Sequence, residues 1–529
     1  MAAVDVASRR LRVGVFADTP RQPRWLVESI ARVAAGDFAE ICVLVTSEKA
    51  NGAPPALWSA YGRLDRWMFG GADPLKPNRV DLLVAPELRV PLAPGDAGWR
   101  NRMAALDLDV AITLGDLDES GLADLARYGA WRFAFGDAQS ADPRVAALRE
   151  VIVGEPVVSA ALRIRRGAAS RIACRSYSRT IPFSIARSHD RIFGKAGAYL
   201  ERSLRRLREE GDGWLDRQET LGEVLQTKPS LGVGESLRGI ASLGASVARR
   251  TVETCFTVGQ WSLAFRFASQ EPWTGSLEGF HRLVPPPDRF WADPFPLTVG
   301  ERHFIFFEEL PFSTGKGHIC CVEVKRDGSA AEPIRVLERD DHLSYPFLIE
   351  HEGRLYMIPE SSSVRTVEAW RCESFPDRWV RERVLLDDVF CADATFLNRG
   401  GRWWMFANAG SDSGGADDEL QLFSSMSLFG EWRPHRANPV KGDVRGSRPA
   451  GRLFEEGGAL YRPSQICAPL YGSGVALNRV TRLDDEAFAE EEVRRIEPAA
   501  RGEGLLGIHT LNRAGDLSVI DAFARRRRF

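Results

Sequence analysis

The stretch Asp293-Pro-Phe-Pro-Leu-Thr-Val-Gly300-Glu-Arg-His-Phe-Ile-Phe contains an apolar run, a turn at a glycine and a second run that includes aromatic residues. A hairpin repeated about every 50 residues is typical of a β-propeller, in which each repeat is one four-stranded blade. Here successive turn glycines lie 53, 48, 57 and 57 residues apart. The five copies begin at Asp293, Tyr345, Asp393, Ala450 and His509, and their turn glycines are Gly300, Gly353, Gly401, Gly458 and Gly515. We therefore predict a five-bladed propeller over residues 261–529.

Residues at the start of each copy are expected to meet, because the first strand of every blade lines the central funnel. Asp293 and Asp393 occupy matching positions in copies one and three. Two carboxyl groups held across a sugar are what glycosidic bond cleavage needs, one as base or nucleophile and one as acid. The alternative is that each aspartate only caps a turn.

The motifs Trp291-Ala-Asp293-Pro-Phe and Ala-Asp393-Ala-Thr-Phe resemble those of the five-bladed propeller glycosidases, the arabinanase, xylosidase and fructosidase group. The resemblance implies that Asp293 is the general base or nucleophile and that Asp393 orients the substrate. The general acid of that group is a glutamate in blade four, but the matching stretch Gly446-Ser-Arg448-Pro holds an arginine.

An arginine does not donate a proton at neutral pH, so ordinary hydrolysis is not expected. Arg448 instead predicts a site for an anionic group such as a phosphate or a sugar carboxylate. Other acids stand near the hairpins but away from the usual position: Glu308, Glu309 and Glu360.

His509 opens the fifth copy. The resemblance to arabinanase-like propellers implies that a histidine in this region helps to hold a central metal ion, which makes His509 a candidate ligand. The alternative is a hydrogen-bonded histidine of the core.

Four further motifs resemble the propeller region of plant glucosamine inositolphosphorylceramide transferases: His342-Leu-Ser-Tyr-Pro-Phe347, Tyr356-Met-Ile-Pro-Glu360, Arg462-Pro-Ser-Gln465 and Tyr471-Gly. The resemblance extends over about residues 280–520, and bacterial relatives place this propeller after a formyltransferase-like domain. It implies a sugar or glycoconjugate ligand. The candidate substrate-binding residues are Trp291, Tyr345, Glu360, Arg448, Gln465 and His509.

Residues 1–185 predict an α/β domain with a mainly parallel, doubly wound sheet, since apolar runs alternate with a helical pattern. The expected strands include residues 12–17, 40–45, 80–85, 108–114 and 129–136, and residues 24–35 have helical spacing. An Arg-rich amphipathic helix is expected over residues 190–210. Residues 186–260 form a helical linker region in this prediction.

The segment Tyr128-Gly-Ala-Trp-Arg-Phe-Ala-Phe-Gly-Asp137 is similar to the formyltransferase fold. That family needs an Asn-x-His motif and an aspartate here, but residues 100–160 contain no histidine and Asp137 is the nearby acid. Formyl transfer by the standard mechanism is therefore not expected. Gly14 lies in the first expected strand, and Asp18 follows it. Doubly wound sheets bind ligands at the carboxyl ends of their strands, so both residues could line a ligand crevice.

The bulk composition indicates a soluble globular protein, with a net charge of −2 and 44% hydrophobic residues. This charge gives no reason to expect a nucleic-acid partner. No run approaches the roughly 18 apolar residues of a membrane helix. Residues 1–10 are polar and the eight cysteines are scattered, so we expect a cytoplasmic protein with reduced thiols.

Three functions remain open at the level of sequence. The first is a carbohydrate-active protein that binds, cleaves or transfers a glycosyl unit in the propeller funnel. The second is a non-catalytic binding scaffold for a glycan or nucleotide sugar, and the third is an amino-sugar formyltransferase.

Overall fold

The computed structural model describes residues 9–47, 56–93, 95–115, 117–119, 121–136, 140–221, 233–267, 279–409, 418–498 and 504–528. The chain forms two compact units, residues 1–248 and 249–529. The domain boundaries predicted from the sequence, after residues 185 and 260, stay predictions. None of the described helices is long and apolar enough to cross a membrane.

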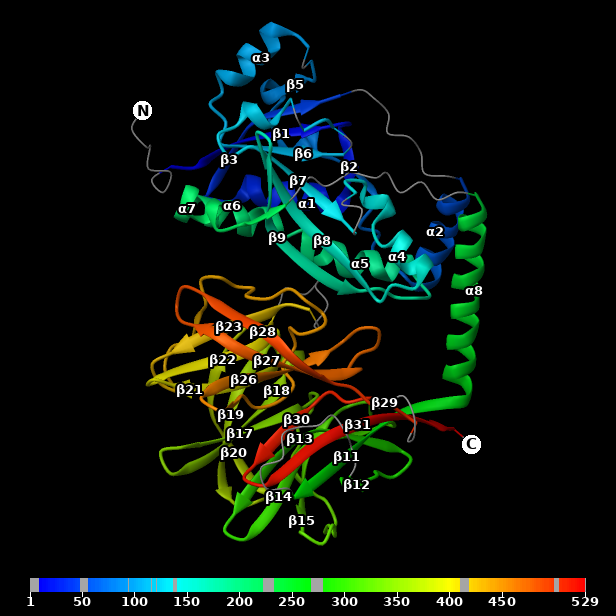
Figure 1. Ribbon diagram of the computed structural model, residues 1–529, viewed down its shortest axis with the longest axis vertical. Helices are drawn as coiled ribbons and strands as arrows, with labels where there is room; N and C mark the ends of the chain where they lie inside the picture. The colour runs from blue at the N-terminus through cyan, green and yellow to red at the C-terminus, as the bar shows by residue number, and fades with distance from the viewer. Residues whose placement is uncertain are drawn as a thin grey trace. The chain divides into compact units, whose positions relative to one another are not determined.

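The first unit is built on an eight-stranded sheet with helices on its two faces (Figure 1). Leu11, Val13 and Val15 point to one face and pack with the helices of residues 24–35, 185–196 and 199–210, whereas Phe16 and Val43 pack on the other face with the helix of residues 97–104. The strand order is β10 (Glu219–Leu221), β9 (Ala169–Arg179), β8 (Val157–Arg166), β7 (Ala130–Phe135), β6 (Val110–Leu114), β1 (Leu11–Ala17), β3 (Ala39–Thr46), β5 (Arg89–Pro91). The helices are α1 (Arg24–Ala35), α2 (Ala56–Phe69), α3 (Ala97–Ala104), α4 (Leu148–Val153), α5 (Ile185–Ala196), α6 (Tyr199–Glu210), α7 (Asp212–Asp216) and α8 (Val233–Phe256).

This sheet is mixed, which corrects the prediction of a mainly parallel one. Strands β5, β3, β1, β6 and β7 pair in parallel, and β7, β8, β9 and β10 pair antiparallel. The antiparallel part follows from a hairpin at Gly167, since adjacent antiparallel strands need no crossover helix.

Two further sequence predictions for this unit are wrong. Residues 80–85 form a short 3₁₀ turn over Asp81–Leu83 instead of a strand, and the Asp81 carboxylate pairs there with Arg79. A short apolar run cannot distinguish a strand from a turn without a partner strand. The single helix expected over residues 190–210 is divided into α5 and α6 at residues 197–198. Their apolar faces, with Ile192 and Leu200, belong to the core of this unit.

The second unit confirms the five-bladed propeller. Four blades are four-stranded antiparallel sheets in sequence order. They are β13 (Arg289–Val299), β14 (Arg302–Pro311), β15 (His318–Val324), β16 (Ile334–Leu337); β17 (Ser344–His351), β18 (Arg354–Ser361), β19 (Thr366–Ser374), β20 (Arg378–Leu386); β21 (Cys391–Arg399), β22 (Arg402–Ala409), β23 (Leu420–Ser425), β24 (Arg433–Pro434); and β25 (Phe454–Glu456), β26 (Ala459–Ile466), β27 (Gly474–Leu483), β28 (Phe488–Ile496). The five turn glycines all have positive φ, which explains why glycine recurs at this point.

The fifth blade closes the ring with strands from both ends of the propeller. Strand β11 (Thr257–Phe267) pairs along its length with β31 (Leu517–Arg527), from Thr257 with Arg527 to Phe267 with Leu517. β12 (His281–Leu283) extends this sheet beside β11, and β29 (Leu505–Gly507) and β30 (Leu511–Ala514) pair with β31. The red and green strands lie side by side in Figure 1.

Candidate active site in the propeller

Five matching positions, one at the start of each blade, carry Asp293, Tyr345, Asp393, Arg448 and His509. In blades one to three this residue interrupts the strand register and has a φ of 52°, 44° and 53°. Such a bulge takes the residue out of the ladder and changes the direction of its side chain. Arg448 has a side chain that is 12% exposed, and the other four are buried.

A second set of polar residues stands behind the first, at the ends of the neighbouring second strands. Glu308 lies opposite Ala292, Glu360 lies opposite Ser344, and Asn408 lies opposite Ala392. In blades four and five the corresponding residues are Gln465, whose backbone N donates to Arg448 O, and Asp521 beside the Ile520–Leu511 pair.

Asp393 is the centre of one cluster. Arg448 Nε lies 2.5 Å from Asp393 Oδ2, and Gln465 Nε2 donates to the same oxygen over 2.8 Å. The backbone N of Asp393 donates to Glu360 Oε2 over 3.0 Å. Burial raises the pKa of Asp393 to about 7, with Arg448 opposing the rise and Glu360 adding to it. Arg448, expected to hold an external anion, therefore holds a carboxylate of the protein itself.

Asp293 is the centre of a second cluster. Thr510 Oγ1 donates to Asp293 Oδ1 over 2.8 Å, and His509 Nε2 lies 3.4 Å from the same oxygen. The other ring nitrogen of His509, Nδ1, lies 2.6 Å from Asp521 Oδ2. Burial raises the pKa of Asp293, although the His509 charge opposes it. The pKa of His509 is also raised, because Asp521 and Asp293 outweigh the effect of its burial.

The two clusters share one environment. The negative charge of Asp393 is among the causes that raise the pKa of Asp293. Tyr471 stands between them, with its ring 5.1 Å from the Arg448 guanidinium and 5.5 Å from the His509 ring. Trp261 stacks on His509 at a centroid distance of 4.0 Å. The structure thus brings the two aspartates predicted from the sequence into electrostatic contact.

The group Asp293, His509 and Asp521 was tested as the metal site expected around His509. The three residues offer ligand atoms within 4.8 Å of one another. However, Asp521 Oδ1 accepts from the backbone N of His509 and of Thr510, and its Oδ2 accepts from the backbone N of Asp293. Because the Asp521 oxygens are occupied, these residues do not fit a three-ligand metal site.

A similar group lies in blade one, made of Glu309, His318 and Cys320. Glu309 already accepts from Trp291 Nε1 over 2.8 Å and from Arg289 Nη1 over 3.0 Å. Burial raises the pKa of the Cys320 thiol to about 12, so the thiol stays protonated in the metal-free protein. This group does not fit a metal site either.

Trp291 and Tyr345, two of the residues predicted to bind substrate, contact other residues of the protein in this structure. The Trp291 indole packs on Phe307 in an apolar cluster and donates to Glu309. The Tyr345 hydroxyl lies 2.8 Å from Thr395 Oγ1 and accepts from the backbone N of Gly451 over 2.7 Å. Tyr345 therefore connects three blades.

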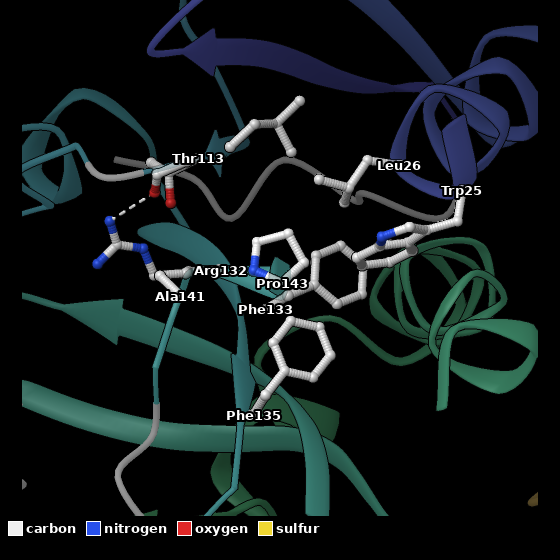
Figure 2. A pocket seen from close by; sticks show the side chains of 10 residues that line it. Trp25, Leu26, Thr113, Arg132, Phe133, Phe135, Ala141 and Pro143 are labelled. Atoms are coloured by element: carbon white, nitrogen blue, oxygen red, sulfur yellow. Dashed lines mark hydrogen bonds between the residues drawn. The ribbon is translucent and has the colours of Figure 1, made fainter. Parts of the chain in front are cut away.

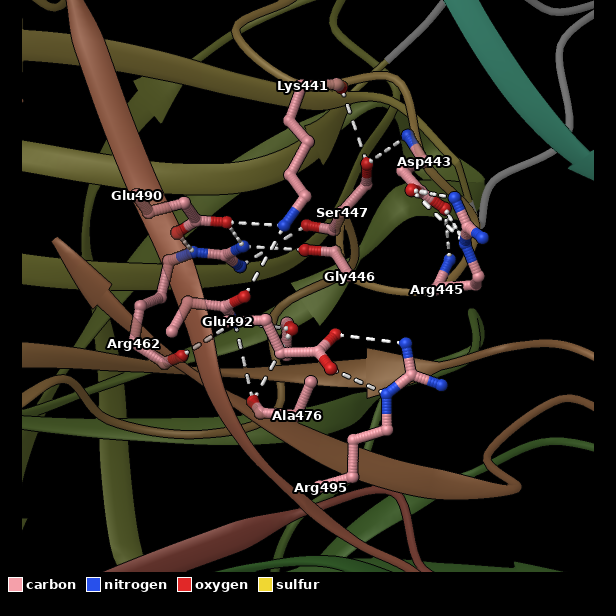
Figure 3. A network of polar contacts seen from close by, with 12 residues as sticks. Lys441, Asp443, Arg445, Gly446, Ser447, Arg462, Ala476, Glu490, Glu492 and Arg495 are labelled. Carbon is pink, nitrogen blue, oxygen red and sulfur yellow. Dashed lines mark hydrogen bonds and ion pairs between the residues drawn. The ribbon is translucent and has the colours of Figure 1, made fainter. Parts of the chain in front are cut away.

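The segment that carries Arg448 is fixed from behind by a buried network in blade four (Figure 3). Arg462 is fully buried; its Nη2 donates to Gly446 O over 2.6 Å and to Glu490 Oε1 over 2.6 Å. Lys441 Nζ also donates to Glu490 Oε1, over 2.6 Å. Figure 3 shows Arg462 between Glu490 and the carbonyl groups of this segment.

The first unit has a small cavity at the carboxyl ends of β6 and β7. Its volume is about 10 Å³, enough for about one water molecule. Trp25, Leu26 and Phe133 line one side, and Thr113 and Arg132 line the other (Figure 2).

Asp18 and Gly14, the two residues expected to line a ligand crevice of this unit, have other contacts in the structure. Asp18 directly follows β1, where the strand order reverses, but it is 4% exposed and its Oδ1 accepts from Gln22 Nε2. Gly14 is a packing residue, since a Cβ there would lie 2.7 Å from Leu108 Cδ1. Asp137 lies outside the described residues.

Several residues of the site were missed by sequence reasoning. Asp521 and Thr510 hold Asp293 and His509, and Trp261 comes from the strand that closes the ring. A signal for Asp521 exists, because a carboxylate within the apolar run Leu517–Ala522 is unusual. Trp261 has no such signal, since only the closed ring brings it to His509.

Residues 283–504 match the family model described as "Glucosamine inositolphosphorylceramide transferase 1, N-terminal". The matched stretch lies within the propeller. Glucosamine inositolphosphorylceramide transferase 1 of Oryza sativa subsp. japonica is 35% identical over 221 residues, 41% of this chain and 30% of the relative. The protein of that name from Arabidopsis thaliana is 33% identical over 225 residues, 41% of this chain and 29% of the relative. The chain thus spans less than a third of these relatives.

Among solved structures, Zg3597, a family 117 glycoside hydrolase of Zobellia galactanivorans, has a TM-score of 0.33 at 11% identity, covering 50% of this chain and 90% of that one. An exo-1,5-α-L-arabinanase from a bovine ruminal metagenomic library has a TM-score of 0.31 at 14% identity, covering 45% and 94%.

Proposed function

We propose that the propeller binds a sugar or the sugar part of a glycoconjugate at the Asp293 and Asp393 clusters and acts there on a glycosidic bond. The observation that carries this proposal is the pair of buried carboxyl groups, each held by its own partners, with the charge of Asp393 adding to the rise in the pKa of Asp293. Carboxyl groups with raised pKa values at one site are typical of proton transfer. The curated relatives are named as transferases of a glycolipid, which favours a glycoconjugate as the ligand.

In this proposal Asp293 is the base or nucleophile. Asp521 orients His509 through Nδ1, and His509 Nε2 then faces Asp293 and balances its charge. Asp393 orients the ligand, with its carboxylate fixed by Arg448 and Gln465. An anionic group on the ligand is not part of the proposal, because Arg448 is engaged by Asp393.

The test is turnover of a panel of activated sugars by the wild type and by Asp293→Asn. We expect the variant to lose activity by at least about 100-fold, because a positioned base contributes on that order. The matched control is Asp288→Asn, which changes an exposed aspartate of the same blade that pairs with Arg289. Equal turnover by wild type and Asp293→Asn would exclude the catalytic role.

A second candidate is a binding protein without catalysis, and the observation that favours it is Arg448 at the position of the expected acid. A thermal-shift screen with the same sugars separates the two. Stabilisation by a sugar without any turnover supports binding alone.

An amino-sugar formyltransferase is the least supported candidate. The first unit contains a single histidine, His189, which is buried on α5 with Nε2 2.7 Å from Ala146 O. Burial lowers the pKa of His189 to about 4. Consumption of formyl-folate with any amine would reopen this candidate.

A further inference from the structure

Glu308 breaks a pattern that repeats around the propeller. In two places, a carboxylate on a second strand accepts the backbone N–H of the bulge residue in the next blade. Asp521 accepts from Asp293 N over 3.1 Å, and Glu360 accepts from Asp393 N over 3.0 Å. Glu308 occupies the corresponding place in blade one, opposite Ala292. Within the described part of the chain, however, its carboxyl group makes no hydrogen bond, and Oε1 is fully buried.

The surroundings of Glu308 disfavour its ionised form. Its side chain is 6% exposed, and four carboxyl groups face it electrostatically: Asp293, Glu360, Asp393 and Asp521. Burial and these charges raise the pKa of Glu308 well above its ordinary value. A buried carboxyl group with like-charged neighbours holds its proton to a higher pH than an exposed one does.

His342 lies beside Glu308 and is partly exposed. Its Nδ1 accepts from the backbone N of Gly317 over 2.9 Å, so a neutral ring carries its proton on Nε2. That nitrogen lies 3.5 Å from Glu308 Oε1, and the His342 side chain is 34% exposed. Gly317 leaves the room for this arrangement, since a Cβ there would lie 2.6 Å from Glu308 Oε1.

We propose that Glu308 is the proton donor of the site, in place of the acid that blade four lacks; this rests on the proposed function. As the glycosidic C–O bond breaks, its electron pair passes to the departing oxygen, which takes the proton of Glu308. The incoming hydroxyl of water or of an acceptor sugar bonds to the sugar carbon and gives its proton to Asp293. Glu308 then regains a proton from solvent.

The kinetic test compares Glu308→Gln with the wild type on two sugars that differ only in the leaving group. With an alkyl leaving group, which needs a proton, we expect kcat to fall by about 100-fold or more. With a dinitrophenyl leaving group, which needs none, kcat should fall less than 10-fold. Glu323→Gln, a change at a surface pair with Arg302 in the same blade, should leave both rates unchanged.

A spectroscopic test needs no substrate. The infrared difference between wild type and Glu308→Gln at pH 7 should contain the C=O stretch of a protonated carboxylic acid. A carboxylate band in its place would overturn the proposal, as would equal losses with both leaving groups. If Asp293→Asn is inactive while Glu308→Gln loses both substrates equally, only the donor role fails. If no sugar is bound or turned over, the proposed function fails and the infrared band still reports on Glu308.

Discussion

The pair of Asp393 and Arg448 shows how single residues set the properties of this site. Both side chains are taken out of water, so each depends on the other for compensation of its charge. The pair nevertheless leaves the pKa of Asp393 raised to about 7, because burial and Glu360 outweigh the guanidinium. The folded protein therefore holds a proton on Asp393 at pH values where an unfolded chain has released it.

This proton predicts a pH dependence of stability. Between about pH 4 and pH 7 the folded state binds more protons at Asp393 than the unfolded state, so the free energy of unfolding falls as pH rises and then levels off. A rise from 3.8 to about 7 corresponds to a total on the order of 4 kcal/mol. Urea denaturation at a series of pH values measures it, and Asp393→Asn should show a correspondingly smaller fall.

Two further variants control this prediction. Arg448→Met removes a charge that lowers the pKa of Asp393, so the fall should continue above pH 7. Asp484→Asn changes an exposed aspartate whose pKa Arg482 lowers to about 2, and it should leave the slope between pH 4 and pH 7 as in the wild type. The same slope in Asp393→Asn as in the wild type would contradict the assignment.

At the scale of strands, the bulge at the start of the inner strand in blades one to three brings residues of the site together. It interrupts the ladder between Ala292 and Phe295, between Ser344 and Phe347, and between Ala392 and Thr395. In blade two the bulge residue is Tyr345, and its hydroxyl joins blade three at Thr395 to the backbone of Gly451. The bulge of blade two thus holds its neighbours together, while those of blades one and three supply carboxylates.

We expect Tyr345→Phe to lower the free energy of unfolding by about 1–3 kcal/mol, because the buried N–H of Gly451 loses its partner. Tyr356→Phe is the matched control, since Tyr356 is also buried in blade two but its hydroxyl has no hydrogen bond among the described residues. Equal midpoints of urea denaturation for the two variants would show that the Tyr345 hydroxyl does not contribute.

At the scale of the whole propeller, closure depends on the pairing of β11 with β31. The two strands come from opposite ends of the unit and pair over eleven residues each. Asp521 on β31 and Trp261 on β11 both reach His509 from this blade. Closure of the ring and assembly of the Asp293 cluster are therefore one event.

A chain that ends after Gly515 lacks β31 and should lose the cooperative unfolding of the propeller. Strand β11 then has no inner partner, and its unpaired edge exposes Leu263 and Phe265. Differential scanning calorimetry and limited proteolysis check this. Arg527→Ala, which removes one exposed side chain from the same strand, should keep the wild-type transition. A propeller transition that persists in the truncated chain would contradict the role of β31.

The propeller could be predicted because its glycine turns are local signals that recur at a regular interval. The same repeats give Asp293, Asp393 and His509, since each opens a copy, and Arg448, which lies two residues before the fourth copy. Glu308 and Asp521 come from second strands, whose alignment with the next blade is a property of the ring. The pairing of Arg448 with Asp393, 55 positions apart, joins blades three and four and was not predicted from the sequence. In the first unit, the antiparallel pairing of β7 with β8 was missed because an apolar run carries no information on its partner.

The closing ladder also has a mechanical consequence. Thr257 pairs with Arg527 at one end of it, so the chain enters β11 and leaves β31 at the same point. A force that pulls residue 256 and the C-terminus apart therefore loads this ladder one hydrogen bond at a time, as a zip opens, instead of loading all of its bonds together in shear. Traction along that direction should open the ring at its closing blade before any other sheet yields.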